Sequence, residues 1–475
     1  MNKVKNILVP LALFAFAFII RIWFIAASPI SNDEPFTIFF SQQSLDELFE
    51  LFQHENNPPF HFLLMHFWMK VFGTSVFSVR FLSVLFGALT VIPIYKIGKE
   101  FFSKNVGVIT ALLFSMSNIH IQEAHDARVY TILVFLSTSS YYFFFKLLKS
   151  PQNLRLKFWY TLILVLMLYS HYISALVLFS QFMTVFIVRK ERWRIRKTIF
   201  VTQLISVVLF IPFITVFIHR IGESAQNESW IPQPTYESLY WILREFFNQP
   251  VVAVAAIISL VGALTLLITK KVQIDRGNAL TIILWFMVPY FVLFFVSFYS
   301  SLFLGKYLLF ASVGFYFVVA FFWDNLLKNK IKYLTFLIPI VLMGATCNPD
   351  MSQNRHPDQM VNLVKKYKNE TTLVFVCPEW EVLSFSYYYN RQYFEDYDNT
   401  KRLLNKENVY FIYNDDGVTG IDMNAYQKII IVDAGCNLYE SPMSDKSAWK
   451  NNYDMMIQED IHPYSISVWE NKNPI

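Results

Sequence analysis

The stretch ILVPLALFAFAFIIRIWFIAA, residues 7–27, decides the fold of this chain, and the polar segment SPISNDEP follows it at residues 28–35. An apolar helix of roughly 20 residues is long enough to cross the hydrocarbon core of a bilayer. Lys3 and Lys5 precede the run, as they would in a secretory signal peptide. However, the run is long, no small-residue cleavage site is convincing, and Arg21 lies within it. The sequence therefore predicts an uncleaved first membrane span.

The composition extends this prediction to the whole chain. Of the 475 residues, 55% are hydrophobic, 18% are aromatic and 16% are charged, and the chain contains 49 Phe. An average soluble domain carries about 25% charged residues, so these values argue against a purely cytosolic globular enzyme. The low numbers of Gly, Pro and Cys also argue against disordered, collagen-like and disulfide-rich proteins. We therefore predict a polytopic α-helical membrane protein.

Further apolar runs follow the first one along the chain. They lie at about 79–95, 106–120, 129–145, 158–170, 171–188, 198–218, 251–269, 279–297, 307–323 and 331–346. The stretch 158–188 is too long for one span, and the polar residues 169–172 interrupt it, so we expect two helices joined by a tight turn. Together, these runs predict about eleven transmembrane helices.

Lysine and arginine are unequally distributed between the two sets of loops. If the N-terminus is cytoplasmic, most cations fall in inner loops. The outer loops hold Lys70, Arg80, Arg128, Arg220, Arg244 and Lys306. The positive-inside rule therefore predicts a cytoplasmic N-terminus in the cytoplasmic (inner) membrane. The net charge of +5 then reflects topology and does not indicate a nucleic-acid partner.

The composition changes after residue 346, because residues 347–475 are acidic overall. Strand-like runs lie at 372–376, 409–413 and 429–432, and helix-like stretches lie at 357–368 and 379–389. This alternation is typical of a small α/β domain, and no glycine-rich phosphate loop follows the strands. An odd number of spans places this domain outside the cytoplasm. We expect a transmembrane domain at 1–346 and an extracytoplasmic α/β domain at 347–475.

The chain has three cysteines, Cys347, Cys377 and Cys436, and all fall on the predicted outer side. Cys377 and Cys436 each follow a strand-like run. In an oxidising compartment such a pair can form a disulfide, but spacing alone does not determine pairing. The sequence leaves a disulfide and two free thiols as open alternatives.

The first outer loop, residues 28–76, carries the paired acids Asp33 and Glu34 at the mouth of the first span. Acids at the edge of the hydrocarbon are costly to place, which favours a functional role. The alternative is a helix N-terminal cap. Farther along the loop, residues 45–52 have helical apolar spacing with acids between, which predicts a short helix lying in the membrane interface.

Two other segments on the predicted outer side carry polar groups. The second outer loop, residues 120–130, holds several ionisable side chains, among them Asp126 and Arg128, which alternatively form a surface ion pair worth at most about 1 kcal/mol. Arg21 and Lys306 lie just inside the membrane, and snorkelling to headgroups is the alternative to a phosphate-binding role. No pair of histidines has a recognisable metal-binding spacing, so a divalent metal is an option that the sequence does not predict.

These features occur together in one family. The chain resembles the GT-C glycosyltransferases of the protein O-mannosyltransferase and aminoarabinose transferase superfamily (family 39-like), in the bacterial branch that uses polyprenyl-phosphate sugars. The resemblance covers residues 1–345 and is carried by the acid pair, by Asn-Pro-Pro-Phe at 57–60, by Asp-Ala-Arg-Val-Tyr at 126–130, and by the segments 169–172, 229–232 and 305–309. The external domain shows no motif that we can match.

The resemblance implies an enzyme that transfers a sugar from a polyprenyl-phosphate donor to a lipid, glycan or protein acceptor in the cell envelope, with inversion. It assigns catalysis to Asp33 as base with Glu34 and Asp126, donor phosphate binding to Arg21, Arg128, Lys306 and His54, and acceptor or sugar binding to Asn57, Tyr130, His171, Tyr172 and Trp230. No cofactor is implied. The chain departs from the family at Asn57, where a basic residue or His is common, and at Lys306, where Arg is common.

Two other classes of function compete with this one. A transporter or flippase for an anionic lipid would also explain Arg21 and the outer acids. Transporters usually show inverted repeats and charges near the midplane, and the sequence shows neither. A sensor or assembly protein would use the external domain to bind a partner. An oligosaccharyltransferase would be expected to carry an Asp-X-Asp site, which the outer loops of the membrane part lack.

Overall fold

The computed structural model describes residues 2–52, 57–188, 193–226, 231–269, 275–326, 332–394, 396–413, 421–436 and 452–472. The chain folds into two compact units. One contains Met1–Ile25 and Asp46–Met351, and the other contains Ala26–Leu45 and Ser352–Ile475. Toward the C-terminus, the division between the units falls after Met351. Residues 26–45 differ from the expectation, because they group with the C-terminal unit.

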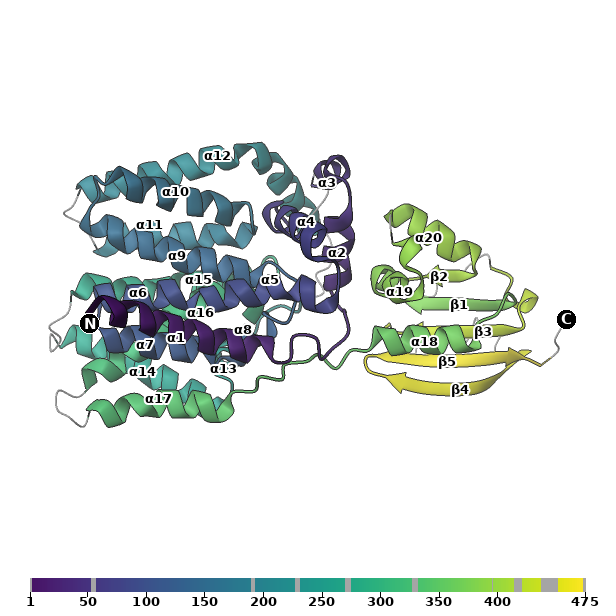
Figure 1. Cartoon of the computed structure of the whole chain (residues 1–475). Helices are drawn as coiled ribbons and strands as arrows, with labels where there is room; N and C mark the ends of the chain where they lie inside the picture. Colours follow the sequence, from purple (N-terminus) through teal and green to yellow (C-terminus); the bar gives the residue numbers. More distant parts are fainter. Residues whose placement is uncertain are drawn as a thin grey trace. The chain divides into compact units, whose positions relative to one another are not determined.

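The first unit is a helical bundle (Figure 1). Its helices in the apolar runs are α1 (Asn2–Ile22), α5 (Val76–Leu89), α6 (Val91–Phe101), α7 (Lys104–Ser115), α9 (Tyr130–Lys149), α10 (Leu154–Leu168), α11 (Ala175–Val188), α12 (Trp193–Gln226), α14 (Pro250–Ile268), α15 (Arg276–Val296), α16 (Leu309–Leu326) and α17 (Lys332–Thr346). Every predicted run contains helix, and α5 and α6 share one run. As predicted, the stretch 158–188 forms two helices, α10 and α11, with a short 3₁₀ helix, η1 (Tyr172–Ser174), before α11.

Length and apolar composition mark membrane spans directly. Within the described residues, six helical stretches are long and apolar enough to cross a bilayer. They are Val76–Phe101, Tyr130–Lys149, Trp193–Val216, Pro250–Ile268, Arg276–Val296 and Gly305–Leu326. Four shorter apolar helices accompany them, among them Ile7–Ile22 of α1. The chain is a multi-pass membrane protein.

Shorter helices lie outside these spans, except for the 3₁₀ helix at Gly305–Leu308, which begins the span Gly305–Leu326. They are α3 (Leu45–Leu51), α4 (Phe60–Phe72), α8 (Asn118–Gln122), α13 (Tyr236–Phe246) and η2 (Gly305–Leu308). The helix predicted at 45–52 is therefore present as α3. α4 begins directly after the two prolines at 58–59, because proline tolerates the first turn of a helix.

Aromatic stacking fills the centre of the bundle around α16. Tyr141 stacks on Trp285 with ring centroids 3.8 Å apart, and Phe286 stacks on Phe315 at 4.4 Å. α16 is almost entirely buried, whereas only 28% of the α12 span is buried inside the protein. The high Phe content therefore builds a packed interior at α16 and a lipid-facing surface at α12.

Polar contacts tie each end of the bundle. At the end where α7 begins, Asp324 accepts hydrogen bonds from Ser103 at 2.6 Å and from Asn105 at 3.2 Å. At the opposite end, the Tyr316 hydroxyl donates to Ser117 Oγ at 2.9 Å, and the Asn118 backbone N–H donates to the Asn248 side chain at 2.8 Å. These contacts hold the loops that connect the helices in place at both ends of the bundle.

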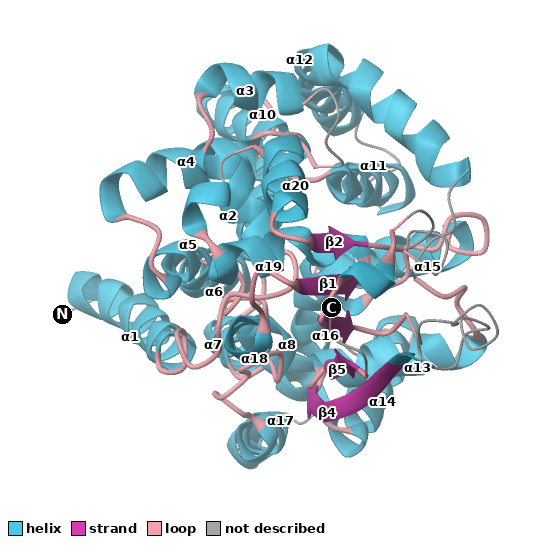
Figure 2. Cartoon of the chain, turned by 90° about the vertical axis from the view of Figure 1, so that its right-hand side faces the viewer, coloured by secondary structure: helices cyan, strands magenta, loops and turns pink. Residues whose placement is uncertain are grey.

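The second unit is built on a five-stranded sheet, seen end-on in Figure 2. Its strands are β1 (Thr372–Cys377), β2 (Val409–Phe411), β3 (Lys428–Asp433), β4 (Tyr453–Ile461) and β5 (Tyr464–Asn471), in the order β2-β1-β3-β5-β4. β1 pairs in parallel with β2 and β3, and β5 pairs antiparallel with β3 and β4. The helices are α2 (Glu34–Gln42), α18 (Pro357–Tyr367), α19 (Val382–Tyr389) and α20 (Tyr397–Lys406).

The predicted α/β pattern agrees with β1, β2, β3, α18 and α19, whereas β4 and β5 were not predicted. β4 is exposed along most of its length, so it lacks the apolar run that marked the other strands. β4 and β5 form a hairpin at the edge of the sheet, joined by two residues at 462–463.

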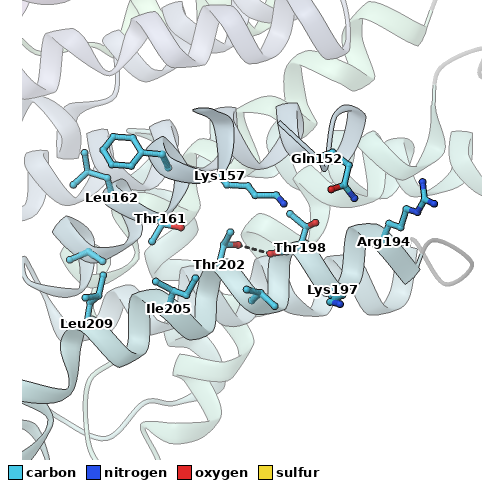
Figure 3. Close-up of a pocket in the computed structure, with 13 residues that line it drawn as sticks. Gln152, Lys157, Thr161, Leu162, Arg194, Lys197, Thr198, Thr202, Ile205 and Leu209 are labelled. Atoms are coloured by element: carbon cyan, nitrogen blue, oxygen red, sulfur yellow. Dashed lines mark hydrogen bonds between the residues drawn. The ribbon is translucent and has the colours of Figure 1, made fainter. Parts of the chain in front are cut away.

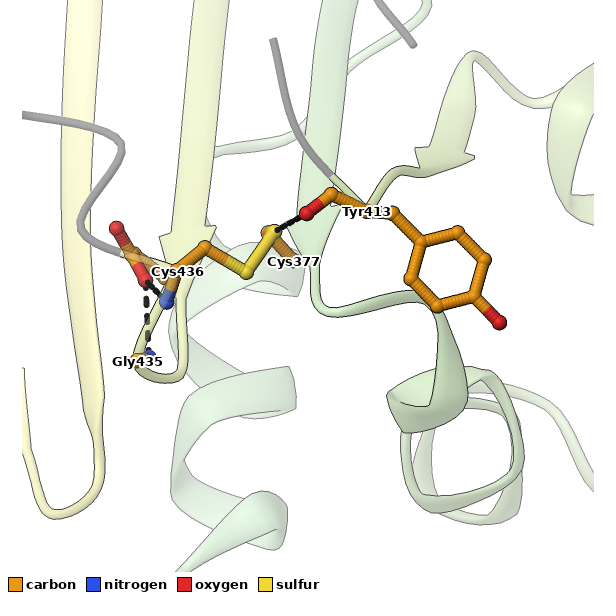
Figure 4. Close-up of a disulfide and its surroundings, with 5 residues drawn as sticks. Cys377, Tyr413, Gly435 and Cys436 are labelled. Carbon is orange, nitrogen blue, oxygen red and sulfur yellow. Dashed lines mark hydrogen bonds between the residues drawn. A yellow bond between two sulfur atoms is a disulfide. The ribbon is translucent and has the colours of Figure 1, made fainter. Parts of the chain in front are cut away.

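The structure closes the question of the cysteines. Cys377 ends β1 and Cys436 follows β3, and because these strands are adjacent and parallel, their ends lie at the same edge of the sheet. The two residues form a disulfide with a Cα–Cα distance of 6.2 Å (Figure 4). The Asp433 carboxylate accepts hydrogen bonds from the backbone N–H groups of Gly435 and Cys436, which shapes the turn that presents Cys436. Cys347 is free.

Candidate active site

A cluster of cationic and aromatic side chains lies at one end of the bundle. Lys306, in η2, lies with its Nζ 5.6 Å from the ring centroid of Tyr130 and 5.9 Å from that of Tyr307. The His171 ring lies 6.0 Å from Tyr130 and 5.8 Å from Tyr307, centroid to centroid. Three segments that are far apart in sequence therefore meet here, at the start of α9, before η1 and in η2. We call Tyr130, His171, Lys306 and Tyr307 the Lys306 cluster.

Arg128 extends the positive field of this cluster. It precedes α9 and is half-buried. The pKa of His171 falls to about 4, first because the ring is buried and then because Arg128 and Lys306 repel a second positive charge. The pKa of His61, on α4, falls to about 3 for the same two reasons, burial and Arg128. Both imidazoles are therefore neutral at physiological pH.

Gly305, the residue before Lys306, packs closely against the side chain of Glu245. Gly305 is buried, and a Cβ at this position would come within 1.8 Å of Glu245 Oε2, from α13. A side chain at this position would force the flexible end of Glu245 to move. Glu245 is thus an acidic side chain next to the cluster that the sequence analysis did not single out.

Tyr169 and Tyr172 connect the cluster to α12. The ring of Phe210 lies 5.1 Å from Tyr169 and 6.4 Å from Tyr172, centroid to centroid. The Tyr169 carbonyl accepts a hydrogen bond from the Phe60 N–H at 2.9 Å, at the first residue of α4. The predicted polar break at 169–172 therefore joins α4, α10 and α12 beside His171.

The loop between α8 and α9 lies beside a second group of buried ionisable side chains. His125 Nε2 lies 2.7 Å from the carbonyl oxygen of Arg21, and burial lowers the pKa of His125 to about 4, with Arg80 and Arg21 contributing. Arg80 is buried at the start of α5 and donates to the Ile25 carbonyl at 3.0 Å. Asp126, on the same loop, is half-buried.

The burial and hydrogen bonds of Arg21 do not match the phosphate-binding role expected for it. Its side chain is fully buried, and it donates to the carbonyls of Ala17 at 3.2 Å, Phe114 at 3.2 Å and Ser115 at 3.3 Å. The last two are carbonyls of the last turn of α7, where the helix dipole favours a cation. The guanidinium also lies over the Phe114 ring at 5.0 Å. Arg21 therefore joins α1 to α7.

In the second unit, the two acids of the first loop have different environments. Asp33 is exposed and occupies the N-cap position of α2 without a side-chain capping hydrogen bond. Glu34 is buried, and its Oε2 accepts a hydrogen bond from the Ser31 N–H at 3.2 Å. No side-chain capping bond is made by Asp33, and Glu34 instead accepts a hydrogen bond from the turn before the helix.

The segment that carries Asp33 is held by the C-terminal fold within this unit. The Tyr388 hydroxyl, on α19, donates to the Ile30 carbonyl at 2.9 Å. Phe39, on α2, packs edge-on against Phe394 with centroids 5.0 Å apart. Residues 26–45 thus pack in a specific way against the C-terminal fold of this unit, which the sequence did not predict.

The other expected site residues are less defined. His54 and Trp230 lie outside the described residues. Asn57 is half-buried and precedes Pro58 and Pro59 at the entrance to α4. Sequence reasoning missed His61, Arg80, Glu245 and Tyr307. Arg80 and His61 are polar residues within apolar helical stretches, and that was the signal available for them. In the described part of the chain, no group of three His, Cys, Asp or Glu side chains is arranged to hold a metal.

Comparison with known proteins agrees with this architecture. Residues 56–219 match the family described as dolichyl-phosphate-mannose-protein mannosyltransferase. No curated protein sequence matches the chain. Among solved structures, ArnT from Cupriavidus metallidurans bound to undecaprenyl phosphate superposes with a TM-score of 0.60 at 10% identity, covering 98% of this chain and 97% of that one. Its apo state gives 0.58 at 11% identity, with 98% of both chains covered.

A second similar structure is the archaeal oligosaccharyltransferase AglB from Archaeoglobus fulgidus in complex with an inhibitory peptide and a dolichol-phosphate. It gives a TM-score of 0.53 at 10% identity, covering 99% of this chain and 75% of that one. At these identities the likeness concerns the fold. The predicted resemblance is confirmed: this chain matches the dolichyl-phosphate-mannose-protein mannosyltransferase family over residues 56–219 and has the GT-C fold of membrane glycosyltransferases.

Proposed function

We propose that this protein is an integral membrane glycosyltransferase that moves a sugar from a polyprenyl-phosphate donor to an acceptor at the outer face of the cytoplasmic membrane. The observation that supports this most directly is the Lys306 cluster, in which a cation, neutral imidazole and tyrosines from three segments meet at one end of a membrane bundle. A lipid-linked donor keeps its chain in the bilayer and presents its phosphate and sugar at such an end. The family match over residues 56–219 supports the same chemistry.

In this proposal, Lys306 and Arg128 bind the phosphate of the donor. Both are cations at the same rim, and both lower the pKa of His171, so their fields overlap there. A phosphate leaving group needs stabilisation of developing negative charge, which preorganised cations supply without an acid. Arg21 is left out because its donors are directed to the α7 carbonyls. His54 stays in the proposal as a further donor-phosphate residue.

The transfer step needs a base at the acceptor. The acceptor oxygen attacks the anomeric carbon, and the bond between that carbon and the phosphate oxygen breaks with its electron pair leaving on the phosphate. The acceptor proton passes to the carboxylate of Asp33. The products are the glycosylated acceptor and polyprenyl phosphate, with inversion at the anomeric carbon. The exposed Asp33 side chain supports this role better than the buried Glu34.

The acceptor or sugar would meet the hydroxyl groups and rings that border the cluster. These hydroxyl groups and rings belong to Tyr130, His171 and Tyr172. The sequence resemblance adds Asn57 and Trp230 to the residues proposed to bind the acceptor or sugar. Asp126 lies on the loop before α9 and would orient the acceptor or the sugar. The positive-inside distribution supports a cytoplasmic N-terminus and an extracytoplasmic second unit. The disulfide supports the same location for that unit, since disulfides persist in oxidising compartments.

The test is genetic complementation read by mass spectrometry. A host lacking the gene is complemented with the wild type, with Asp33→Asn, or with Glu50→Gln as a control acid that is exposed on α3. We expect Asp33→Asn to leave the lipid-linked sugar accumulated and the envelope glycan missing, as in the deletion strain, at wild-type protein levels. Glu50→Gln should restore the wild-type pattern. Full restoration by Asp33→Asn would overturn the role of Asp33 as base.

A further inference from the structure

A groove lies between α10 and α12, with a cavity volume of about 580 Å³. Figure 3 shows its lining side chains. Leu162, Ile205 and Leu209 lie toward one end, while Gln152 and Arg194 lie toward the other. The groove therefore has an apolar end and a polar end.

The polar end carries positive charge. Lys157, Arg194 and Lys197 line the groove, and no acidic side chain is among the described residues that do so. Arg194 and Lys197 are exposed and Lys157 is half-buried, all on the first turns of α10 and α12. A bound anion there would meet cations from two helices.

Two of the three threonine hydroxyl groups that line the groove donate to carbonyls of the protein. Thr202 donates to the Thr198 carbonyl at 2.9 Å, drawn as a dashed line in Figure 3, and Thr198 donates to the Pro151 carbonyl at 3.1 Å. These bonds leave the wall of the groove apolar in character, which suits a hydrocarbon chain and not a sugar or a peptide.

The length of the groove fits one lipid leaflet. From Arg194 to Leu209 along α12 the distance is about 22 Å at a rise of ~1.5 Å per residue. One leaflet of hydrocarbon is about 15 Å thick, half of the core. A headgroup at Arg194 would therefore have its acyl chain covered along α12 as far as the middle of the membrane.

We propose that this groove binds one anionic glycerophospholipid, with its phosphate at Lys157, Arg194 and Lys197 and an acyl chain between α10 and α12. The site lies at the end of the bundle opposite to the Lys306 cluster, because its cations are at the start of α10 and His171 follows the end of α10. A donor lipid bound here would present its phosphate at the wrong rim for transfer. An ordinary membrane lipid is therefore the occupant.

The lipid would support α12, which has little protein around it. Only 28% of the α12 span is buried, and Val201, Leu204 and Leu209 are exposed on it. Farther along α12, Phe210 and Phe213 pack against Tyr169, beside His171. A lipid in the groove thus stabilises the helix that borders the Lys306 cluster.

Native mass spectrometry of the full-length protein in detergent tests this site. Phosphatidylglycerol, phosphatidylcholine and undecaprenyl phosphate are each titrated as probes. We expect phosphatidylglycerol to bind most tightly, and the variant Lys157→Gln/Arg194→Gln/Lys197→Gln to bind it at least about tenfold more weakly, since each cation near a membrane surface adds to anionic lipid affinity. The control Lys96→Gln/Lys104→Gln/Arg276→Gln removes three exposed cations from the same end of the bundle and should bind it as the wild type does.

A second variant tests the apolar part separately. Ile205 is 45% exposed in the groove, so Ile205→Trp fills the space without disturbing the core. We expect it to weaken phosphatidylglycerol binding while the charges stay in place. Equal binding of phosphatidylglycerol and phosphatidylcholine, or unchanged binding by the triple variant, would overturn the proposal. Preferential binding of undecaprenyl phosphate that the triple variant loses would also overturn it, because the occupant would then be the donor lipid.

Discussion

Lys306 Nζ lies 5.6 Å from the centre of the Tyr130 ring, although the two residues are 176 positions apart in the sequence (306 − 130). A cation held over an aromatic face at this distance gains about 0.5–1 kcal/mol at an exposed site. The contact does more than stabilise, because it holds the ammonium beside His171 and within the field of Arg128. The first prediction tests this arrangement.

Lys306→Met should lower kcat/KM for the lipid donor by roughly 10²–10³, the usual loss when one preorganised group that stabilises developing negative charge is removed. Lys306→Arg should keep most of the activity, because the charge remains. Lys70→Gln, at the end of α4, is the matched control. A steady-state assay with purified variants decides this. Wild-type kinetics for Lys306→Met would exclude the residue from phosphate binding.

Arg21→Met should destabilise the fold. It removes charge-assisted hydrogen bonds to the carbonyls of Phe114 and Ser115, which are worth about 1.5–3 kcal/mol each when the donor is charged. Thermal unfolding of the protein in detergent should show a lower midpoint. The opposite pattern, with an unchanged midpoint and a raised KM for donor, would return Arg21 to the phosphate site.

Glu34→Ala and Asp33→Asn should separate stability from activity. Glu34 is buried and accepts a hydrogen bond from the Ser31 N–H. Its loss should lower the free energy of unfolding by about 1–3 kcal/mol, and the unfolding midpoint should fall with it. Asp33 is exposed, so Asp33→Asn should leave the midpoint unchanged and abolish transfer. Both midpoints and initial rates are measured on the same preparations. Loss of stability in Asp33→Asn would contradict this division.

Stability should fall as the pH is lowered from about 6.5 to 4. The pKa of His125 drops from its ordinary value of 6.5 to about 4 in the folded state because the ring is buried. Within this window the unfolded chain binds a proton that the folded chain does not, so acid favours unfolding and neutral pH favours folding. Unfolding midpoints between pH 4.5 and 7 measure the slope. His125→Gln should make the slope shallower while His61 and His171 still contribute to it, and an unchanged slope would assign it to those other groups.

The disulfide should stabilise the second unit. With a sequence separation of 59 between Cys377 and Cys436, the loop-closure model assigns about 4 kcal/mol to the bond. The double variant Cys377→Ser/Cys436→Ser should unfold at a lower temperature, and Cys347→Ser is the control because Cys347 is free. Thiol titration of denatured wild type should give one thiol before reduction and three after it. Three thiols before reduction would exclude the bond.

The sequence by itself determined the membrane class, the positions of the helices and most of the α/β pattern. These features follow from local quantities, because the length of an apolar run and the periodicity of side chains belong to neighbouring residues. The helices at 45–52 and 158–188 were predicted for the same reason. β4 escaped prediction because its exposed side chains give no apolar run.

Tertiary structure alone decided which polar residues work together. Tyr130, His171 and Lys306 meet only because α9, η1 and η2 begin at the same rim, and no spacing in the sequence encodes that. The same holds for Arg21, whose partners on α7 were invisible in the sequence, and for residues 26–45, which group with the C-terminal unit. A side chain's hydrogen bonds and burial depend on segments distant in the chain, so its chemistry is set only when those segments have packed.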